Sequence, residues 1–341
     1  MRKVNVLFKR TFGFTILILR LLGMFPFWYN KPEKRFHLSN PLIAYSVVVC
    51  SLYVYFIGVF YWTTVQFVRI YRSHYNVYLL GAAFGTAYAT VIVVNLTSVV
   101  FARRVLRLLN DCHRLWDQLQ VKSVVEDQDK KLVYRFMFKM IVVDGLTIIG
   151  GAGIRLIQAI RSKSMSLFYE AVAHGFTYIL HACTTNLFIG MAYFGGHFFR
   201  LINCRIRLLH RRISHLEQQE HHSKPNVQKK QQIYNNTLDE LNRLVRYHEK
   251  VNRTILSFMQ VHDASLLMMT LKNFVVTTTG VYLTYVATVF ALHRNQVPSF
   301  GTYGFVTFFA LFHFSQFYYQ TASTMIFTMR VSLNLSITES Y

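Results

Sequence analysis

Long apolar runs are the feature that most constrains how this chain can fold. A helix that spans the hydrocarbon core of a bilayer needs about 20 mostly apolar residues. Five runs meet that length plainly, and they cover residues 41–65, 78–101, 166–196, 266–292 and 300–329. A sixth run, residues 136–160, is also apolar but contains Lys139, Asp144 and Arg155. We therefore predict an all-α fold, a polytopic transmembrane helical bundle with six spanning helices.

Composition agrees with a membrane protein. Hydrophobic residues make up 53% of the chain and charged residues only 15%, which lies outside the range of an ordinary soluble domain. The formal net charge of +22 would suit a nucleic-acid binder, but the cationic residues are spread between apolar runs and form no basic domain. We expect the lipid bilayer as their partner and no nucleic acid.

Lys and Arg collect on one side of the predicted helices. Eight precede the first run, eight lie in the linker that ends at Arg135, twelve lie between Arg200 and Arg253, and one is Arg330, so 29 of the 37 share one face. Because cationic loops are retained in the cytoplasm during insertion, we predict that both termini are cytoplasmic. The N-x-S/T triplets at Asn235 and Asn252 then lie inside the cell, where no glycan is added.

This topology divides the chain into five parts. The first apolar stretch, residues 11–19, is too short to span, and we expect it to lie in the membrane interface. The parts are a cytoplasmic or interfacial N-terminal segment (1–40), transmembrane helices 1–4 (41–199) with a cytoplasmic linker (102–135), cytoplasmic anchor helices with a mobile connector (200–260), transmembrane helices 5–6 (261–329) and a short cytoplasmic tail (330–341).

Three segments continue as amphipathic helices beyond the predicted membrane. Residues 202–216 carry apolar side chains at alternating spacings of four and three, with arginines on the other faces. Similar stripes occupy residues 105–119 and 234–255, whereas residues 217–232 are polar, contain Pro225 and predict a mobile connector. These basic helices could lie on anionic lipid headgroups. We favour the alternative that they pack on one another and on copies of themselves.

No enzyme signature occurs in the sequence. There is no metalloprotease or nucleophile-elbow motif, no phosphate-binding glycine loop and no Cys-x-x-Cys pair. His221 and His222 are adjacent in the predicted connector, without the further ligands that a metal site needs. We expect neither enzymatic activity nor a metal or other cofactor.

Ionisable and aromatic side chains at membrane depth predict a small-molecule pocket. A charged group near the bilayer centre costs at least a few kcal/mol unless it is paired or hydrated, and polar groups among aromatic walls are typical of ligand pockets. Single residues of this kind more often serve packing, so the prediction concerns the region. We expect Lys139 and Lys272 to extend to the inner surface. The candidate ligand-binding residues are Asp144, Arg155, Glu170, His174, Tyr178, Tyr282, Tyr285, Phe305 and Phe309.

The segment Gly23-Met-Phe-Pro-Phe27 resembles the Gly-Leu-Phe-Pro-Phe entry found in several insect gustatory receptors. The helix Leu238-Asp-Glu-Leu-Asn-Arg-Leu244, which leads through Tyr247-His-Glu-Lys250 to the fifth run, agrees with the same family. The resemblance covers essentially the whole chain. It implies a subunit of a tetrameric, ligand-gated cation channel, homo- or hetero-oligomeric with related receptors. It also implies a small-molecule tastant, bitter or otherwise aversive, and a plasma-membrane location in a gustatory neuron.

One departure from the family concerns its seventh helix, which lines the pore and carries Thr-Tyr, five apolar residues and Gln-Phe. Neither Thr284-Tyr285 nor Thr302-Tyr303 is followed by Gln-Phe at that spacing. We expect this pore helix to be absent from the chain, either because the product is truncated or because this member does not conduct alone. Two other functions stay open, namely a secondary transporter that uses Asp144, Arg155 and Glu170 as a relay, and a non-conducting accessory subunit.

Overall fold

The computed structural model describes residues 13–70, 75–119, 134–163, 165–222, 227–293 and 311–322. Almost all of these residues are helical, so the predicted helical class is confirmed. Within the described residues, three segments are long and apolar enough to cross a membrane: Asn40–Val59, Gly81–Val100 and Lys230–Val286. They overlap the first, second and fifth of the predicted spans in chain order, and the third of them begins well before the predicted run 266–292.

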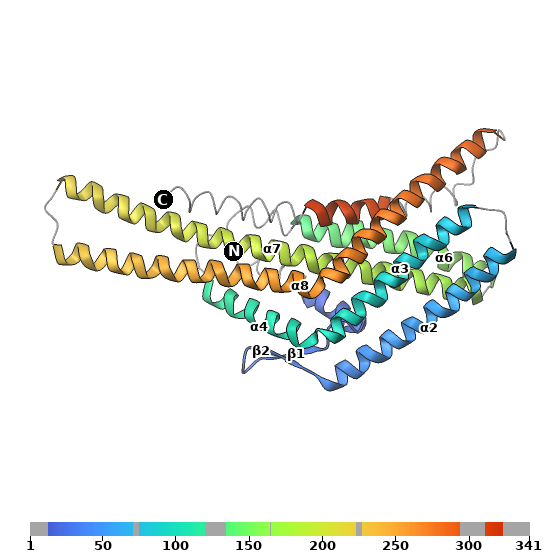
Figure 1. The fold of residues 1–341 in the computed structure, drawn as a ribbon, viewed down its shortest axis with the longest axis horizontal. Helices are drawn as coiled ribbons and strands as arrows, with labels where there is room; N and C mark the ends of the chain where they lie inside the picture. The colour runs from blue at the N-terminus through green and yellow to red at the C-terminus, as the bar shows by residue number, and fades with distance from the viewer. Residues whose placement is uncertain are drawn as a thin grey trace.

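The long helices form a bundle that continues at one end into a two-helix extension (Figure 1). Helices α2 (Asn40–Ile70), α3 (Tyr75–Val100), α6 (Gly145–Ser162) and parts of α7 and α8 make the bundle. Helix α7 (Met165–His222) and helix α8 (Val227–His293) run past the others as an antiparallel pair. Both helices are therefore shared by the bundle and the extension.

Helices α7 and α8 are longer than the sequence predicts. The mobile connector expected over residues 217–232 is helical at both ends, because α7 continues to His222 and α8 begins at Val227. Only residues 223–226 of that segment lie outside the described part of the chain. The bounds predicted for the connector are therefore wrong.

Helix α4 (Ala102–Leu119) follows α3 after a break at Phe101. The sequence change at this point is sharp, since α3 is apolar all round whereas α4 alternates arginines with leucines. Arg103 and Arg104 are exposed on α4, and Leu108 and Leu115 are buried. An amphipathic helix lowers its free energy by burying only one face, so α4 turns that face toward α7 and α8.

Where α4 lies against the two-helix extension, the three helices share an apolar core. Leu115 and Leu119 of α4, Ile202 and Leu209 of α7, and Leu244 of α8 belong to one buried cluster. The prediction that these stripes pack on one another is confirmed for α4 and α7. On α8 it is mainly other residues that make the contact, because Leu238, Leu241 and Val245 of the predicted stripe are exposed. The predicted packing on other copies stays a prediction.

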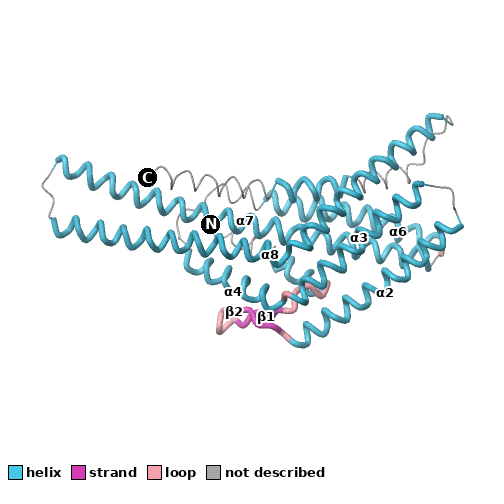
Figure 2. Tube along the Cα trace, viewed as in Figure 1, coloured by secondary structure: helices cyan, strands magenta, loops and turns pink. Residues whose placement is uncertain are grey.

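A β-hairpin that the sequence analysis missed lies beside α4 (Figure 2). Strand β1 (Phe27–Asn30) pairs antiparallel with strand β2 (Arg35–Leu38). The side chain of Asn110 binds the backbone of Phe36 twice, accepting from its N–H at 2.8 Å and donating to its C=O at 3.1 Å. The side-chain amide of Asn110 thus replaces a neighbouring strand, which explains how so short a hairpin is held.

Gly23 has a conformational role at the end of the helix over residues 13–21. Its φ of 71° is left-handed, and the N–H of Met24 donates to the C=O of Leu19 at 2.8 Å. This bond is the C-terminal cap that glycine favours. A Cβ at Gly23 would also lie 3.1 Å from the Cα of Ser46 on α2. Both constraints require glycine where the chain turns toward the hairpin.

Candidate functional site

A π-helical turn, η1 (Lys139–Asp144), lies directly before α6. A π-turn joins residue i to residue i+5 and frequently marks a functional site. Lys139 and Asp144 are five residues apart, and the Lys139 ammonium donates to Asp144 Oδ2 at 2.9 Å. The local backbone geometry therefore places an ion pair inside a largely apolar segment.

Side chains from two further helices form hydrogen bonds with this ion pair. The side chain of Asn186 on α7 donates to Asp144 Oδ2 at 2.8 Å and accepts from Lys139 Nζ at 2.7 Å. Gln316 donates to Asp144 Oδ1 at 2.7 Å. Asp144 thus accepts three hydrogen bonds, and the buried carboxylate and ammonium are both satisfied, as groups removed from water require.

A second buried polar cluster surrounds Asn273 of α8. Asn273 Oδ1 lies 3.0 Å from His181 Nε2 on α7 and 3.3 Å from His313 Nδ1. Because a carbonyl oxygen only accepts, both imidazoles donate to it, which assigns a proton to His181 Nε2 and to His313 Nδ1. Tyr178 extends the cluster, since its ring stacks on the His313 ring with centroids 6.1 Å apart.

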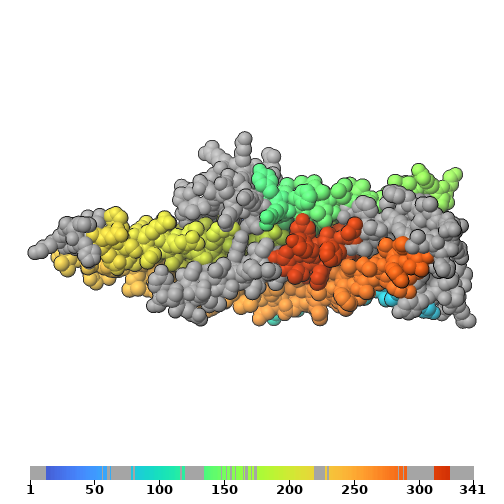
Figure 3. Space-filling view, turned by 90° about the horizontal axis from the view of Figure 1, so that it is seen from above, coloured from blue at the N-terminus to red at the C-terminus, as the bar shows by residue number. Residues whose placement is uncertain are grey.

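The helical residues 311–322 connect the two clusters. This segment, red in Figure 3, lies between η1 and α6 on one side and α8 on the other. His313 and Gln316 are three residues apart, hence on one face of a helix, and they contact the Asn273 cluster and the Asp144 cluster respectively. The buried polar interior therefore joins four segments that are far apart in the sequence.

The two lysines of this interior are both buried. Lys139 and Lys272 are each only 1% exposed. The expectation that they extend to the inner surface is therefore wrong, because each side chain finds room between helices. Lys139 has Asp144 as its counter-ion, whereas Lys272 has no ion pair or hydrogen bond within the described residues.

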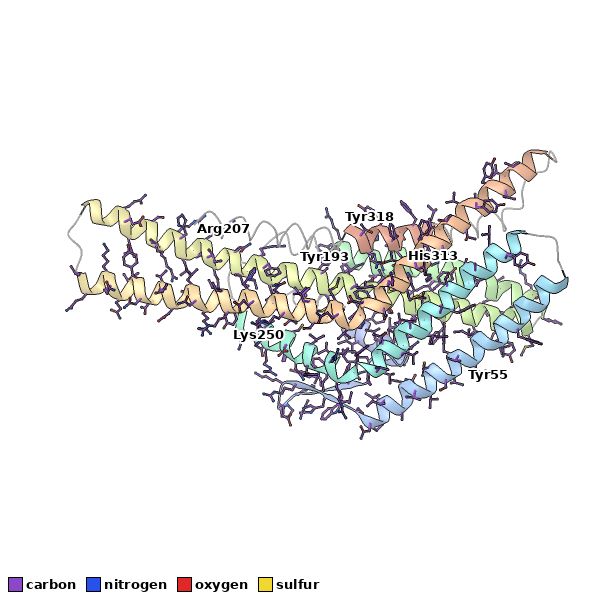
Figure 4. All side chains as sticks on the ribbon, viewed as in Figure 1. Tyr55, Tyr193, Arg207, Lys250, His313 and Tyr318 are labelled. Carbon is purple, nitrogen blue, oxygen red and sulfur yellow. The ribbon has the colours of Figure 1, made fainter. Side chains whose placement is uncertain are left out.

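Two of the predicted ligand-binding residues lie in this interior. Asp144 is the centre of the first cluster, and Tyr178 is 4% exposed and stacks on the ring of His313. His313 is labelled in Figure 4. Tyr282 and Tyr285 of α8 are 36% and 67% exposed, so they lie outside this buried interior. Of the four candidates whose side chains are described, two therefore lie in the buried polar interior and two do not.

Of the other five candidates, the structure gives either the backbone alone or no position. The structure places Arg155 on α6 and Glu170 and His174 on α7 by their backbones, and describes no side-chain contacts for them. Phe305 and Phe309 lie outside the described residues. For these five, as for the four described candidates, the ligand-binding role stays a prediction.

Sequence reasoning missed Asn186, His181, Asn273 and Gln316. The signal was present, because each is a polar residue inside an apolar run, where an unsatisfied polar group is costly. His181 and Asn186, five residues apart on α7, each serve a different cluster. Weighing amides and imidazoles as heavily as formal charges would have identified them.

The helices, the apolar spans and the paired charges at their centre define a helical membrane protein with a polar interior. A model of the 7tm chemosensory receptor family matches residues 12–338. The chain therefore belongs to this family of chemosensory receptors, which is not an enzyme family, and the family resemblance noted in the sequence is confirmed. No individually curated protein matches the chain.

Proposed function

We propose that this protein is a gustatory chemoreceptor, a subunit of a tastant-gated cation channel in the plasma membrane of a gustatory neuron. Its ligand is a small molecule, bitter or otherwise aversive. The observation that carries the proposal is the match of nearly the whole chain to a chemosensory receptor family. The buried polar interior supports it, because a receptor for small molecules needs polar groups that are enclosed by helices.

The arrangement of the clusters suggests how a ligand could act. Asn273 on α8 is bonded to His181 on α7 and to His313, and Gln316 is bonded to Asp144 beside α6. A ligand that contacts these groups differently in two packings shifts the equilibrium between them by its differential affinity. Because α7 and α8 continue into the extension, such a change in helix packing would be transmitted from the bundle to the extension.

Assembly with other subunits belongs to the same proposal. On the extension, Leu238, Leu241 and Val245 of α8 are 57%, 40% and 51% exposed. Exposed apolar residues at helical spacing support a contact with another helix. We propose homo- or hetero-oligomers with related receptors, a tetramer in the simplest case.

Functional expression tests this proposal. The chain is expressed alone and together with a second family member, its surface delivery is verified by biotinylation, and currents are recorded during application of a broad tastant panel. A ligand-evoked cation current in either condition is the expected result. Silence across the panel in both conditions, with verified surface expression, would refute the receptor assignment.

One observation favours a second candidate, a secondary transporter. The buried Lys139–Asp144 pair is the kind of intramembrane ion pair found in proton relays. A transporter would give saturable uptake without channel-sized current, and Asp144→Asn would abolish it. The accessory-subunit alternative instead predicts that the chain changes the currents of a partner receptor while producing none alone.

A further inference from the structure

The two buried lysines of the bundle differ in how their charge is compensated. Lys139 lies against Asp144 at 2.9 Å. Lys272 is equally buried, and among the described residues it makes no ion pair and no hydrogen bond. Within that part of the chain, the fully buried acidic and basic side chains are Lys139, Lys272 and Asp144. When Lys272 is protonated, its charge therefore has no counter-ion among the described residues.

A buried, uncompensated ammonium is costly. An ionised group removed from water is normally paired or hydrogen-bonded, because its hydration free energy is lost. The charge of Lys272 acts on the rings of His181 and His313, and an imidazole side chain carries no negative charge. Neither ring supplies the missing negative charge.

Asn273, the next residue of α8, contacts the same two imidazoles and carries a further hydrogen-bond donor. Its Oδ1 is occupied by the two imidazoles. Its Nδ2 is fully buried and has no partner among the described residues. A buried amide N–H without an acceptor is itself unfavourable. A positive charge and an unused donor on adjacent residues are complementary to an anion.

We propose that Lys272 and Asn273 form a binding site for a small monovalent anion, the carboxylate of a small organic acid or an inorganic anion such as chloride. The anion neutralises Lys272 and accepts from Asn273 Nδ2. Only one part of this inference rests on the proposed receptor function, namely that the bound anion acts as a tastant. Binding itself is independent of channel activity, so the two can fail separately.

The test uses the full chain purified in nanodiscs, with thermal unfolding as the readout. Sodium propionate and sodium chloride are each titrated against sodium gluconate, a bulky anion, at constant ionic strength, with propionamide as the neutral analogue of propionate. Stabilisation by propionate but not chloride assigns the site to organic acids, and equal stabilisation assigns it to any small anion. No stabilisation by either, or equal stabilisation by propionamide, overturns the proposal.

Variants locate the effect. Lys272→Met should weaken anion binding about 10- to 100-fold, the loss expected for one charged hydrogen-bond partner. Lys250→Met, a lysine of the same helix in the extension (Figure 4), is the matched control and should leave binding unchanged.

A second variant covers the case in which Lys272→Met does not fold. Asn273→Asp keeps an acceptor for both imidazoles and supplies an internal negative charge. It should unfold at a higher temperature than the parent and lose its response to anions. A full anion response in either Lys272→Met or Asn273→Asp contradicts the proposed site.

Discussion

Removing the charge of Asp144 should destabilise the protein strongly. Asp144→Asn keeps the size of the side chain but replaces one acceptor oxygen by a donor. In the structure Oδ2 accepts from Lys139 and Asn186, and Oδ1 accepts from Gln316. Whichever way the new amide is turned, a buried donor loses its acceptor, and Lys139 loses its counter-ion. Breaking a buried ion pair by changing one partner costs about 3–5 kcal/mol.

The double variant Lys139→Met/Asp144→Asn separates charge from packing. It removes both charges, so no buried ammonium remains, and replacing a buried pair by groups of similar volume is often close to neutral. We expect the double variant to unfold with a free energy within about 1–2 kcal/mol of the parent, nearer to it than Asp144→Asn alone.

Unfolding by SDS in mixed micelles, followed by far-UV circular dichroism, measures these differences. Glu249→Gln is the control, because its ion pair with Arg253 is exposed, at 3.4 Å, and should contribute less than about 1 kcal/mol. Two results would contradict the assigned energy of the Lys139–Asp144 pair. One is a loss of unfolding free energy in Asp144→Asn no larger than that in Glu249→Gln. The other is a loss in the double variant equal to the sum of the losses in Lys139→Met and Asp144→Asn.

Three further predictions concern the rest of the molecule. Burial, with a smaller contribution from Asp111, raises the pKa of the Cys112 thiol to about 12, so the thiol stays protonated at pH 7–8 and should react with a maleimide only after unfolding; rapid labelling of native Cys112, read by mass spectrometry, would contradict this. Leu115→Ala removes a fully buried side chain from the core of the extension and should cost about 2–5 kcal/mol, whereas Leu208→Ala, at 43% exposed, should change the unfolding free energy by less than about 0.5 kcal/mol. A tag ahead of Met1 should be inaccessible to antibody on intact cells, and Asn235 should carry no glycan by mobility shift after glycosidase treatment; either opposite result would invert the predicted topology.

The sequence by itself determined the helical membrane class. Apolar runs of bilayer length have few alternatives, since each backbone polar group in lipid must be bonded within its own segment. The stripes at residues 105–119 and 202–216 determined that the extension would have an apolar core, because helical spacing gathers such residues on one face. The family could also be inferred from the sequence, through Gly23-Met-Phe-Pro-Phe27 and the general layout.

Only the tertiary structure decided which polar residues meet. Lys139 and Asp144 are near neighbours in sequence, but their pairing depends on a π-turn, and periodicity gives no sign of that turn. Asn186 and Gln316 join them from segments 42 and 172 residues away from Asp144. The same holds for the hairpin, which Asn110 and His113 of α4 bind through Phe36 and Tyr29. Periodicity indicates which face of a helix is buried, whereas the partner of a buried polar group depends on how the helices are rotated and staggered against one another.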